Sequence, residues 1–298
     1  MIRVWLQAFR LRTLPLSLAS IGMAGFLAAQ QNAFDGRVFA LCCLTTVFLQ
    51  ILSNLANDYG DSVHGADHAG RQGPTRAVQS GAISVAQMKR AMALFVALCL
   101  ASGVSLLLAA FGTNWTAILF FFGLGLASIV AAIGYTVGKK PYGYLGLGDF
   151  SVLIFFGFVG VLGALYLFTH TFRWVDVLPA LSCGLFSIGV LNINNTRDIE
   201  SDRTAGKFSV PVRIGKKNAA IYQSLLLFSA TLASVGFVLL NYQSPFQFLF
   251  LITVPLQVHI AKGVHQLPSN QLDPYLKKMA LTTLAFVLLF GAGLLLAV

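Results

Sequence analysis

Two stretches of the sequence place carboxylate and amide side chains at the same spacing. In NDYGDSVHGAD (57–67) Asn57 precedes Asp61 by four residues, and in LNINNTRDIESD (191–202) Asn194 precedes Asp198 by four. Carboxylate oxygens, together with the phosphates of a bound substrate, are the ligands that Mg²⁺ takes most often in proteins. The two stretches therefore predict a site for Mg²⁺ and a phosphorylated substrate. The candidate metal ligands are Asp58, Asp61, Asp67, Asp198 and Asp202.

Helix periodicity brings these side chains onto common faces. Residues four apart lie about one turn apart on the same side of an α-helix, so Asp198 faces the same way as Asp202. Five carboxylates that converge from two helix ends repel one another unless cations lie between them. They outweigh the charge of two Mg²⁺ ions, and a bound diphosphate adds to the excess, so basic residues must assist. The candidates nearby in sequence are Arg71, Arg76, Lys139, Lys140, Arg197, Lys207 and Arg213.

The same polar residues also fit a simpler interpretation. Asp and Asn are common helix caps, and Lys and Arg are common at the membrane interface. For one residue alone this simpler interpretation is favoured. The shared spacing of the two stretches favours a functional site that both stretches form together.

The elements that carry these stretches are expected to cross a membrane. Of the 298 residues, 57% are hydrophobic and only 10% are charged, whereas a soluble domain carries about 25% charged residues. Seven uncharged runs reach the length of about 20 residues that a spanning helix needs. The two longest contain the polar breaks FGTNW (111–115) and NYQSP (241–245) and count as two spans each, which gives nine helices. The runs are 13–34, 38–57, 91–138, 150–172, 177–196, 218–261 and 279–298.

The basic residues predict how the helices are oriented. If the N-terminus is cytoplasmic, 18 of the 20 Lys and Arg residues lie on the cytoplasmic side, and only Arg37 and Arg173 lie outside. This asymmetry follows the positive-inside rule. The net charge of +10 is then explained by topology in a lipid bilayer, with no need for a nucleic-acid partner. We expect a multi-pass protein of the inner (cytoplasmic) membrane, with cytoplasmic active-site loops and an outer C-terminus.

The spacing of the two polar stretches along the chain predicts an internal repeat. They end the second and sixth predicted spans, which are four apart and run in the same direction. We therefore expect one all-α integral membrane domain over residues 1–298, built from two related four-helix halves plus a ninth helix. The basic N-terminus resembles a signal peptide but lacks a clean cleavage site, so we expect an uncleaved first helix.

With both stretches identified, the chain resembles the UbiA superfamily of intramembrane aromatic prenyltransferases. The first family motif, NDxxDxxxD, is met at Asn57, Asp58 and Asp61, but Gly65 occupies its last position and Asp67 follows two residues later. The YxxxK element is met by Tyr135 and Lys139. Four stretches resemble the menaquinone-pathway branch of the family: NDYGDSVHGAD, GPTRAVQSGAIS, KKPYGYLGLGD and LNINNTRDIESDRTAGK.

The resemblance implies a reaction and roles for individual residues. It implies transfer of a polyprenyl chain from polyprenyl diphosphate to 1,4-dihydroxy-2-naphthoate, with Mg²⁺ as cofactor and loss of carbon dioxide. Asp149 is expected to orient or deprotonate a ring hydroxyl, or else to cap its helix or bind Lys139, and Arg12 is expected to face the aromatic carboxylate. The implied catalytic residues are Asp61, Asp198, Asp202, Lys139, Tyr135 and Asp149. The implied substrate-binding residues are Asn57, Asn195, Arg71, Arg76, Arg197, Lys207 and Arg12. An allylic cation is expected to be stabilised by Tyr135, Tyr142 and Tyr144.

Three alternatives remain open at this point. A transporter places charge or broken helices near the bilayer midplane, whereas the charges here lie at or beyond the ends of the predicted spans. A CDP-alcohol phosphotransferase needs a DGxxAR run, and the only Asp-Gly pair, Asp35-Gly36, is followed by RVFA. Within the superfamily, a 4-hydroxybenzoate polyprenyltransferase is disfavoured by the pattern from Gly65 to Asp67.

Overall fold

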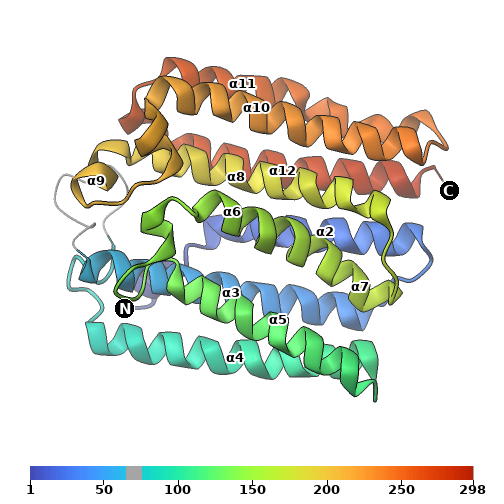
Figure 1. Cartoon of the computed structure of the whole chain (residues 1–298), viewed down its shortest axis with the longest axis horizontal. Helices are drawn as coiled ribbons and strands as arrows, with labels where there is room; N and C mark the ends of the chain where they lie inside the picture. The colour runs from blue at the N-terminus through green and yellow to red at the C-terminus, as the bar shows by residue number, and fades with distance from the viewer. Residues whose placement is uncertain (65–75, 298) are drawn as a thin grey trace.

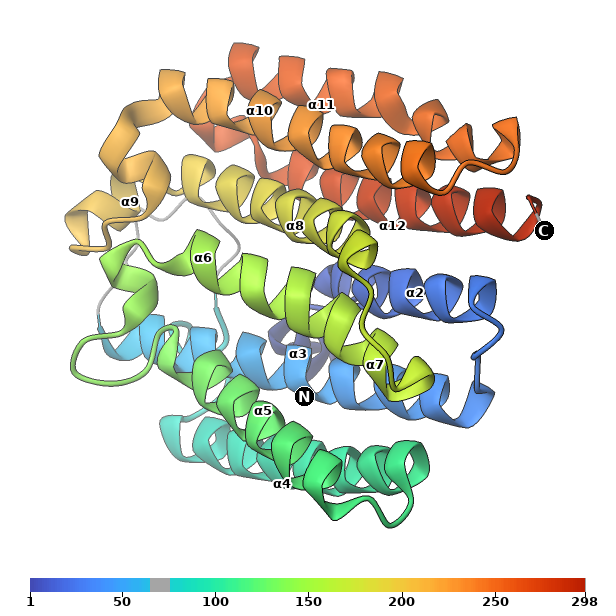
Figure 2. The same cartoon turned by 45° about the vertical axis from the view of Figure 1, so that its right-hand side comes forward.

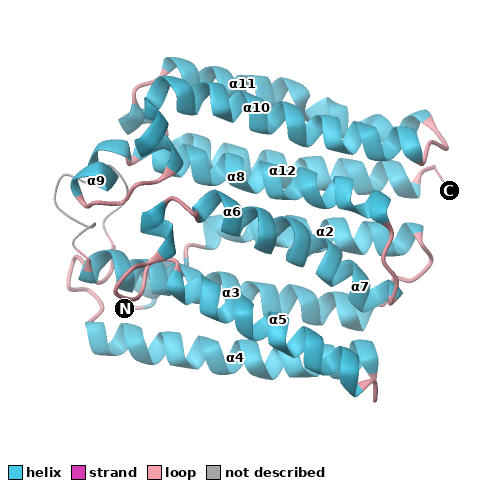
Figure 3. Cartoon of the chain, viewed as in Figure 1, coloured by secondary structure: helices cyan, strands magenta, loops and turns pink. Residues whose placement is uncertain are grey.

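The computed structural model describes residues 1–64 and 76–297, and its described part is helical throughout, with no β-strand (Figure 3). Nine helical segments of the described chain are long and apolar enough to cross a membrane. The prediction of nine spans is therefore confirmed. The helices are α1 (Ile2–Phe9), α2 (Leu14–Gln30), α3 (Gly36–Val63), α4 (Val85–Phe111), α5 (Trp115–Gly134), α6 (Gly148–Val152), the π-helix η3 (Leu153–Gly163), α7 (Ala164–Thr169), α8 (Val177–Arg197), α9 (Ile199–Thr204), α10 (Val210–Leu240), the 3₁₀ helix η5 (Pro245–Thr253), α11 (Val254–Gln266) and α12 (Asp273–Leu295).

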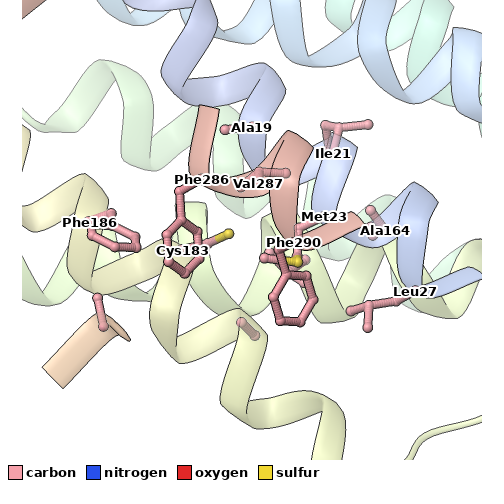
Figure 4. Packing of buried hydrophobic residues seen from close by; sticks show 14 of the residues in the cluster. Ala19, Ile21, Met23, Leu27, Ala164, Cys183, Phe186, Phe286, Val287 and Phe290 are labelled. Carbon is pink, nitrogen blue, oxygen red and sulfur yellow. The ribbon is translucent and has the colours of Figure 1, made fainter. Parts of the chain in front are cut away.

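The long helices lie side by side in one bundle, roughly parallel or antiparallel to one another (Figures 1 and 2). α12 packs against α2 and α8, and α8 in turn packs against α10 and η3. The ring centroids of Phe186 on α8 and Phe286 on α12 lie 4.6 Å apart in an edge-to-face contact, an arrangement that aromatic pairs favour. Figure 4 shows this buried cluster, with Met23 and Leu27 of α2 beside Phe290. The prediction of two related four-helix halves stays a prediction.

Side-chain caps explain where several spans begin. Asp35 accepts the backbone N–H groups of Arg37 and Val38 at 2.7 and 3.1 Å and starts α3. Ser84 and Gln87 form a capping box at the start of α4. Asn114, in the predicted break FGTNW, accepts the N–H of Ala117 and starts α5. These caps satisfy N–H groups that have no partner inside the helix.

Three helices depart from the regular geometry expected from hydropathy alone. The first span is broken: α1 ends at Phe9, the next residue, Arg10, has a left-handed φ of 50°, and α2 begins at Leu14. The fifth span contains the π-helix Leu153–Gly163. α10 contains a non-helical residue, Gly215, with a φ of 78°. Hydrophobic periodicity does not predict local breaks of this kind.

The described residues of both polar stretches lie at one end of the bundle. α9 and the polar ends of α3 and α8 lie together there, at the left of Figure 1, and the C-terminus lies at the opposite end. We call this end, formed by the C-terminal turns of α3 and α8, α9 and the N-terminus of α12, the α9 end. It is the end predicted to be cytoplasmic, and that orientation stays a prediction.

Candidate active site

The first polar stretch ends in a buried cluster around Asp61. Asp61 lies in the last turns of α3 and is 3% exposed. Its carboxylate accepts a hydrogen bond from Tyr144 Oη at 2.8 Å and forms an ion pair with Arg76 Nη1 at 2.5 Å. Arg76 also donates to the backbone carbonyl of Asn57 at 2.5 Å. Arg76 therefore lies beside the first acidic stretch, and its predicted part in binding a diphosphate stays a prediction.

Asp58, one residue after Asn57, has different contacts. Its two carboxylate oxygens accept the backbone N–H groups of Ala77 and Val78, each at 3.2 Å. Asp58 therefore holds the loop that carries Arg76 against α3. Asp58 and Asp61 are three residues apart, about 60° around the helix, and yet have different partners: Asp58 binds the backbone after Arg76, and Asp61 binds Tyr144 and Arg76.

Close packing fixes the rotation of this helix end. Gly60 lies against Thr136, and a Cβ at Gly60 would come within 2.5 Å of the Thr136 carbonyl oxygen. The hydroxyl of Thr136 donates to Ala56 O at 3.0 Å and lies 3.1 Å from Asn57 Oδ1. The segment after α5 is thus joined to the first polar stretch, an interaction that the sequence pattern did not reveal.

The second polar stretch is organised around a buried arginine. The Arg197 side chain is 1% exposed and donates from Nε and Nη2 to the two oxygens of Asp198, at 2.8 and 2.6 Å. It also donates to Asn194 Oδ1 at 3.0 Å and to Asp273 Oδ1 at 2.5 Å. Arg197, which we predicted to bind substrate, therefore already has protein acceptors on Nε and on both terminal nitrogens.

Lys207 joins the second stretch to the first. Its ammonium lies 3.4 Å from Asp202 and 6.0 Å from the ring centroid of Tyr144. Burial is the main cause that raises the pKa of Asp202, to about 6; Lys207 acts to lower this pKa, and the negative charges of Asp198 and Asp61 raise it further. Burial acts to lower the pKa of Lys207, but Asp202 and Asp61 raise it above its usual value. Acids and bases of the two stretches thus act on one another electrostatically.

A cavity of about 430 Å³ begins at these residues and extends between the helices. Its polar end is lined by Asn57, Asp61, Arg76, Asn194 and Lys207. Most of its length is apolar, with walls from α2, α3, α4, α5, η3 and α8. The apolar lining includes Leu100, Leu106, Leu107, Phe121, Phe122, Phe155, Phe156 and Leu167. The cavity fits a molecule with an anionic head and a long apolar chain.

Other predicted residues differ in their relation to this cavity. Tyr135 lines it, makes an edge-to-face contact with Tyr142 at 5.4 Å, and has its pKa raised to about 12 by burial. Arg12 also lines it and pairs with Asp273 at 3.4 Å. Lys139 is exposed to solvent.

Asp149 lies beside a different hollow. It accepts a hydrogen bond from Tyr222 Oη at 2.8 Å and lines a separate groove with Phe150, Leu153 and Leu185. It does not line the main cavity, so its predicted contact with a substrate hydroxyl has no geometric support here. Asp67 and Arg71 lie outside the described residues.

Two residues of this end were not assigned these roles from the sequence. Tyr144 was expected to stabilise a cation, whereas its hydroxyl donates to Asp61. Asp273 was not singled out at all, although it bonds both Arg12 and Arg197. Its signal in the sequence was its position as an acid at the start of the last span, on the side that carries most of the other acids.

The donor set fits Mg²⁺ held together with a substrate's phosphates. In the described chain no three acidic, His or Cys side chains form a ready-made ion site. Asn195 Oδ1 and Asp202 Oδ2, however, are buried and accept no hydrogen bond there, although Lys207 lies close to Asp202. Hard oxygen donors next to cationic side chains match a metal that keeps one or two carboxylates and completes its shell with phosphate oxygens.

Fold and site together define the class: a helical membrane protein with a charged site at the mouth of a long apolar cavity. The chain is then placed more closely by comparison with known proteins. The model of the UbiA prenyltransferase family matches residues 18–284. The chain belongs to the UbiA prenyltransferase family, and it is a prenyltransferase.

Several curated relatives match almost the whole chain. A protein of Haemophilus influenzae named 1,4-dihydroxy-2-naphthoate octaprenyltransferase is 45% identical over 99% of this chain and 96% of its own length. The Escherichia coli protein of the same name is 44% identical with the same coverage. A Mycobacterium tuberculosis protein of that name is 33% identical over 97% of this chain and 96% of its own length.

Solved structures support the fold. A UbiA homologue from Aeropyrum pernix K1 superposes with a TM-score of 0.65 at 20% identity, over 96% of this chain and 97% of that one. A UbiA homologue from Archaeoglobus fulgidus, bound to GPP and Mg²⁺, gives a TM-score of 0.63 at 16% identity, over 96% and 99% of the two chains. The predicted all-helical, UbiA-like fold is therefore confirmed.

Proposed function

We propose that this enzyme transfers a polyprenyl chain from its diphosphate to 1,4-dihydroxy-2-naphthoate, with loss of carbon dioxide, and that it uses Mg²⁺. The product is demethylmenaquinol, on the menaquinone pathway. The observation that carries the proposal is that Asp61, Arg76 and Lys207 meet at the polar end of a long apolar cavity. The names of the curated relatives support the aromatic substrate and a long prenyl donor.

The polar end binds the leaving group. Arg76 and Lys207 supply positive charge for the diphosphate. Asp61 keeps Arg76 in position and is itself held by the Tyr144 hydroxyl. When bound at this end, Mg²⁺ would supply Lewis-acid stabilisation of the negative charge that develops on the departing diphosphate. Asp61, Asp198, Asp202 and Asn195 are the residues that would hold it.

The apolar part of the cavity protects the prenyl group. Breaking the bond between the allylic carbon and oxygen leaves a carbocation that water would capture, so its surroundings must exclude water. Tyr135 and Tyr142 line the cavity, and aromatic rings stabilise a nearby cation. An electron-rich naphthoate ring carbon then forms the new carbon–carbon bond. Loss of carbon dioxide from that carbon returns the electron pair to the ring.

A two-acceptor assay tests the proposal. Membranes that contain the protein are given a polyprenyl diphosphate and either 1,4-dihydroxy-2-naphthoate or 4-hydroxybenzoate, with Mg²⁺ or with EDTA. We expect product from the naphthoate only, and only with Mg²⁺. Preference for 4-hydroxybenzoate would refute the proposed acceptor, and full activity in EDTA would refute the metal requirement.

Membrane orientation is a separate part of the proposal. The distribution of basic residues supports a cytoplasmic position for the α9 end. Cysteines introduced singly at Lys139 and at Tyr242, near opposite ends of the bundle, test it. In intact cells, a membrane-impermeant thiol reagent is expected to label only the cysteine at position 242, and the reverse pattern would refute the orientation.

A further inference from the structure

The carboxylate of Asp273 contacts two arginines at the α9 end. Asp273 begins α12 and lies 76 positions after Arg197 in the sequence. One of its oxygens accepts from Arg197 Nη1 at 2.5 Å and the other from Arg12 Nη1 at 3.4 Å. The first and last spans are thereby joined to the second acidic stretch.

Arg197 needs this second carboxylate for an electrostatic reason. Its buried charge is shared between Asp198 and Asp273. Separating a buried guanidinium from its counter-ion is costly because the charge then lies in a medium of low polarity. If Asp198 turns from Arg197 to ligate a metal, Asp273 is the carboxylate that still compensates Arg197.

The usual role of an acid at a helix start does not account for these contacts. Asp and Glu are common in the first turn of a helix, where they cap backbone N–H groups and offset the helix dipole. Asp273 lies in the first turn of α12, where its charge offsets the dipole, but Leu272 is in the capping position and α12 has no side-chain cap. Among the described residues, the two side-chain hydrogen bonds that Asp273 accepts come from arginines.

We infer that Asp273 is a positioning residue for the metal and diphosphate site: it holds Arg197 in place and compensates its charge while Asp198 binds Mg²⁺. This inference rests on the proposed function, because it assumes that Asp198 is a metal ligand. Asp273 itself touches neither substrate nor metal. Its removal therefore weakens the response to Mg²⁺ and leaves the apolar cavity unchanged.

The test measures binding without turnover. Detergent-purified full-length protein is titrated with Mg²⁺ at a fixed concentration of inorganic pyrophosphate, and the rise in unfolding temperature is recorded. In Asp273→Asn, the Mg²⁺ concentration for half-maximal stabilisation is expected to rise by about 10- to 100-fold, the usual effect of losing a residue that orients a metal ligand. Asp273→Glu, which keeps the charge, is expected to recover most of the response and serves as the folded variant if Asp273→Asn aggregates.

Glu200→Gln is the matched control. It removes one negative charge from the same end, but Glu200 is 78% exposed and pairs only with the exposed Arg203 at 3.3 Å among the described residues. Its Mg²⁺ response is expected to equal that of the wild type. If Asp273→Asn also matches the wild type, or if Asp273→Glu is as impaired as Asp273→Asn, the role of Asp273 is refuted while the proposed function stands. A wild-type protein that Mg²⁺ and pyrophosphate do not stabilise refutes both.

Discussion

The ends of α3 and α8 carry similar residues in different surroundings. At the end of α3, Asp61 and Arg76 form an ion pair that lines the cavity. At the end of α8, Arg197 and Asp198 form an ion pair that is almost fully buried and does not line it. The second stretch reaches the cavity through Asn194 and Lys207 instead.

This difference shows that two similar motifs can contribute differently to one candidate site. The arginine beside α3 has a carboxylate partner and also access to a ligand. Arg197 in α8 is held by protein groups and does not line the cavity, so it positions and neutralises the carboxylates of Asp198 and Asp273. A substitution at the α3 end should therefore act mainly on substrate binding and turnover, and one at Arg197 mainly on stability and on the placement of Asp198.

The largest effect is expected from loss of the acid that faces the cavity. Asp61→Asn removes the charge that holds Arg76 and that we propose to bind Mg²⁺, so turnover should fall on the order of 100-fold or more. Product formation with excess Mg²⁺ measures this, and size-exclusion chromatography checks that the protein is still folded. Asp198→Asn is expected to abolish turnover too, through the metal. Full activity in either variant contradicts the proposed site.

A pair of arginine variants separates the two regions. Arg197→Met leaves two carboxylates without their buried cation, and breaking such a pair costs about 3–5 kcal/mol, so thermal unfolding should occur at a much lower temperature. Arg76→Met should be less destabilising, because Lys207 and Tyr144 remain near Asp61, but should raise KM for polyprenyl diphosphate about tenfold. If Arg76→Met loses as much stability as Arg197→Met and its KM for polyprenyl diphosphate is unchanged, the proposed difference between the two regions is refuted.

The smallest effect is expected at the phenol that supports Asp61. Tyr144→Phe keeps the ring but loses the 2.8 Å hydrogen bond to Asp61, which should lower kcat/KM by about tenfold or less. Steady-state kinetics measures this change. Tyr242→Phe, which removes a hydroxyl near the opposite end of the bundle, is the control and should match the wild type. Equal activity of both variants would show that the Tyr144 hydroxyl does not position Asp61.

Much of the fold could be predicted because membrane insertion imposes a simple rule. A spanning helix needs a long apolar run, and basic residues gather on one side, so the nine spans were readable from composition along the chain. The break between α1 and α2 at Arg10 was not predicted, because the left-handed conformation of one residue does not change the hydropathy of the segment.

The candidate site was predictable in its residue types but not in its pairings. The common spacing of Asn57 with Asp61 and of Asn194 with Asp198 pointed to two related polar helix ends. The separate roles of Asp58 and Asp61 depend on how α3 is rotated, which the contact of Gly60 with Thr136 decides. No local pattern encodes such a contact.

The sequence by itself determined that the chain is a membrane protein of nine helices and that its acids and bases are concentrated at one end. Only the tertiary structure decided that Asp61 and Arg76 face the cavity, that Arg197 is buried behind it and that Asp273 completes its charge. The physical reason is distance along the chain. Hydrophobicity and helical periodicity act over a few turns, whereas ion pairs in a bundle join residues that only packing brings together.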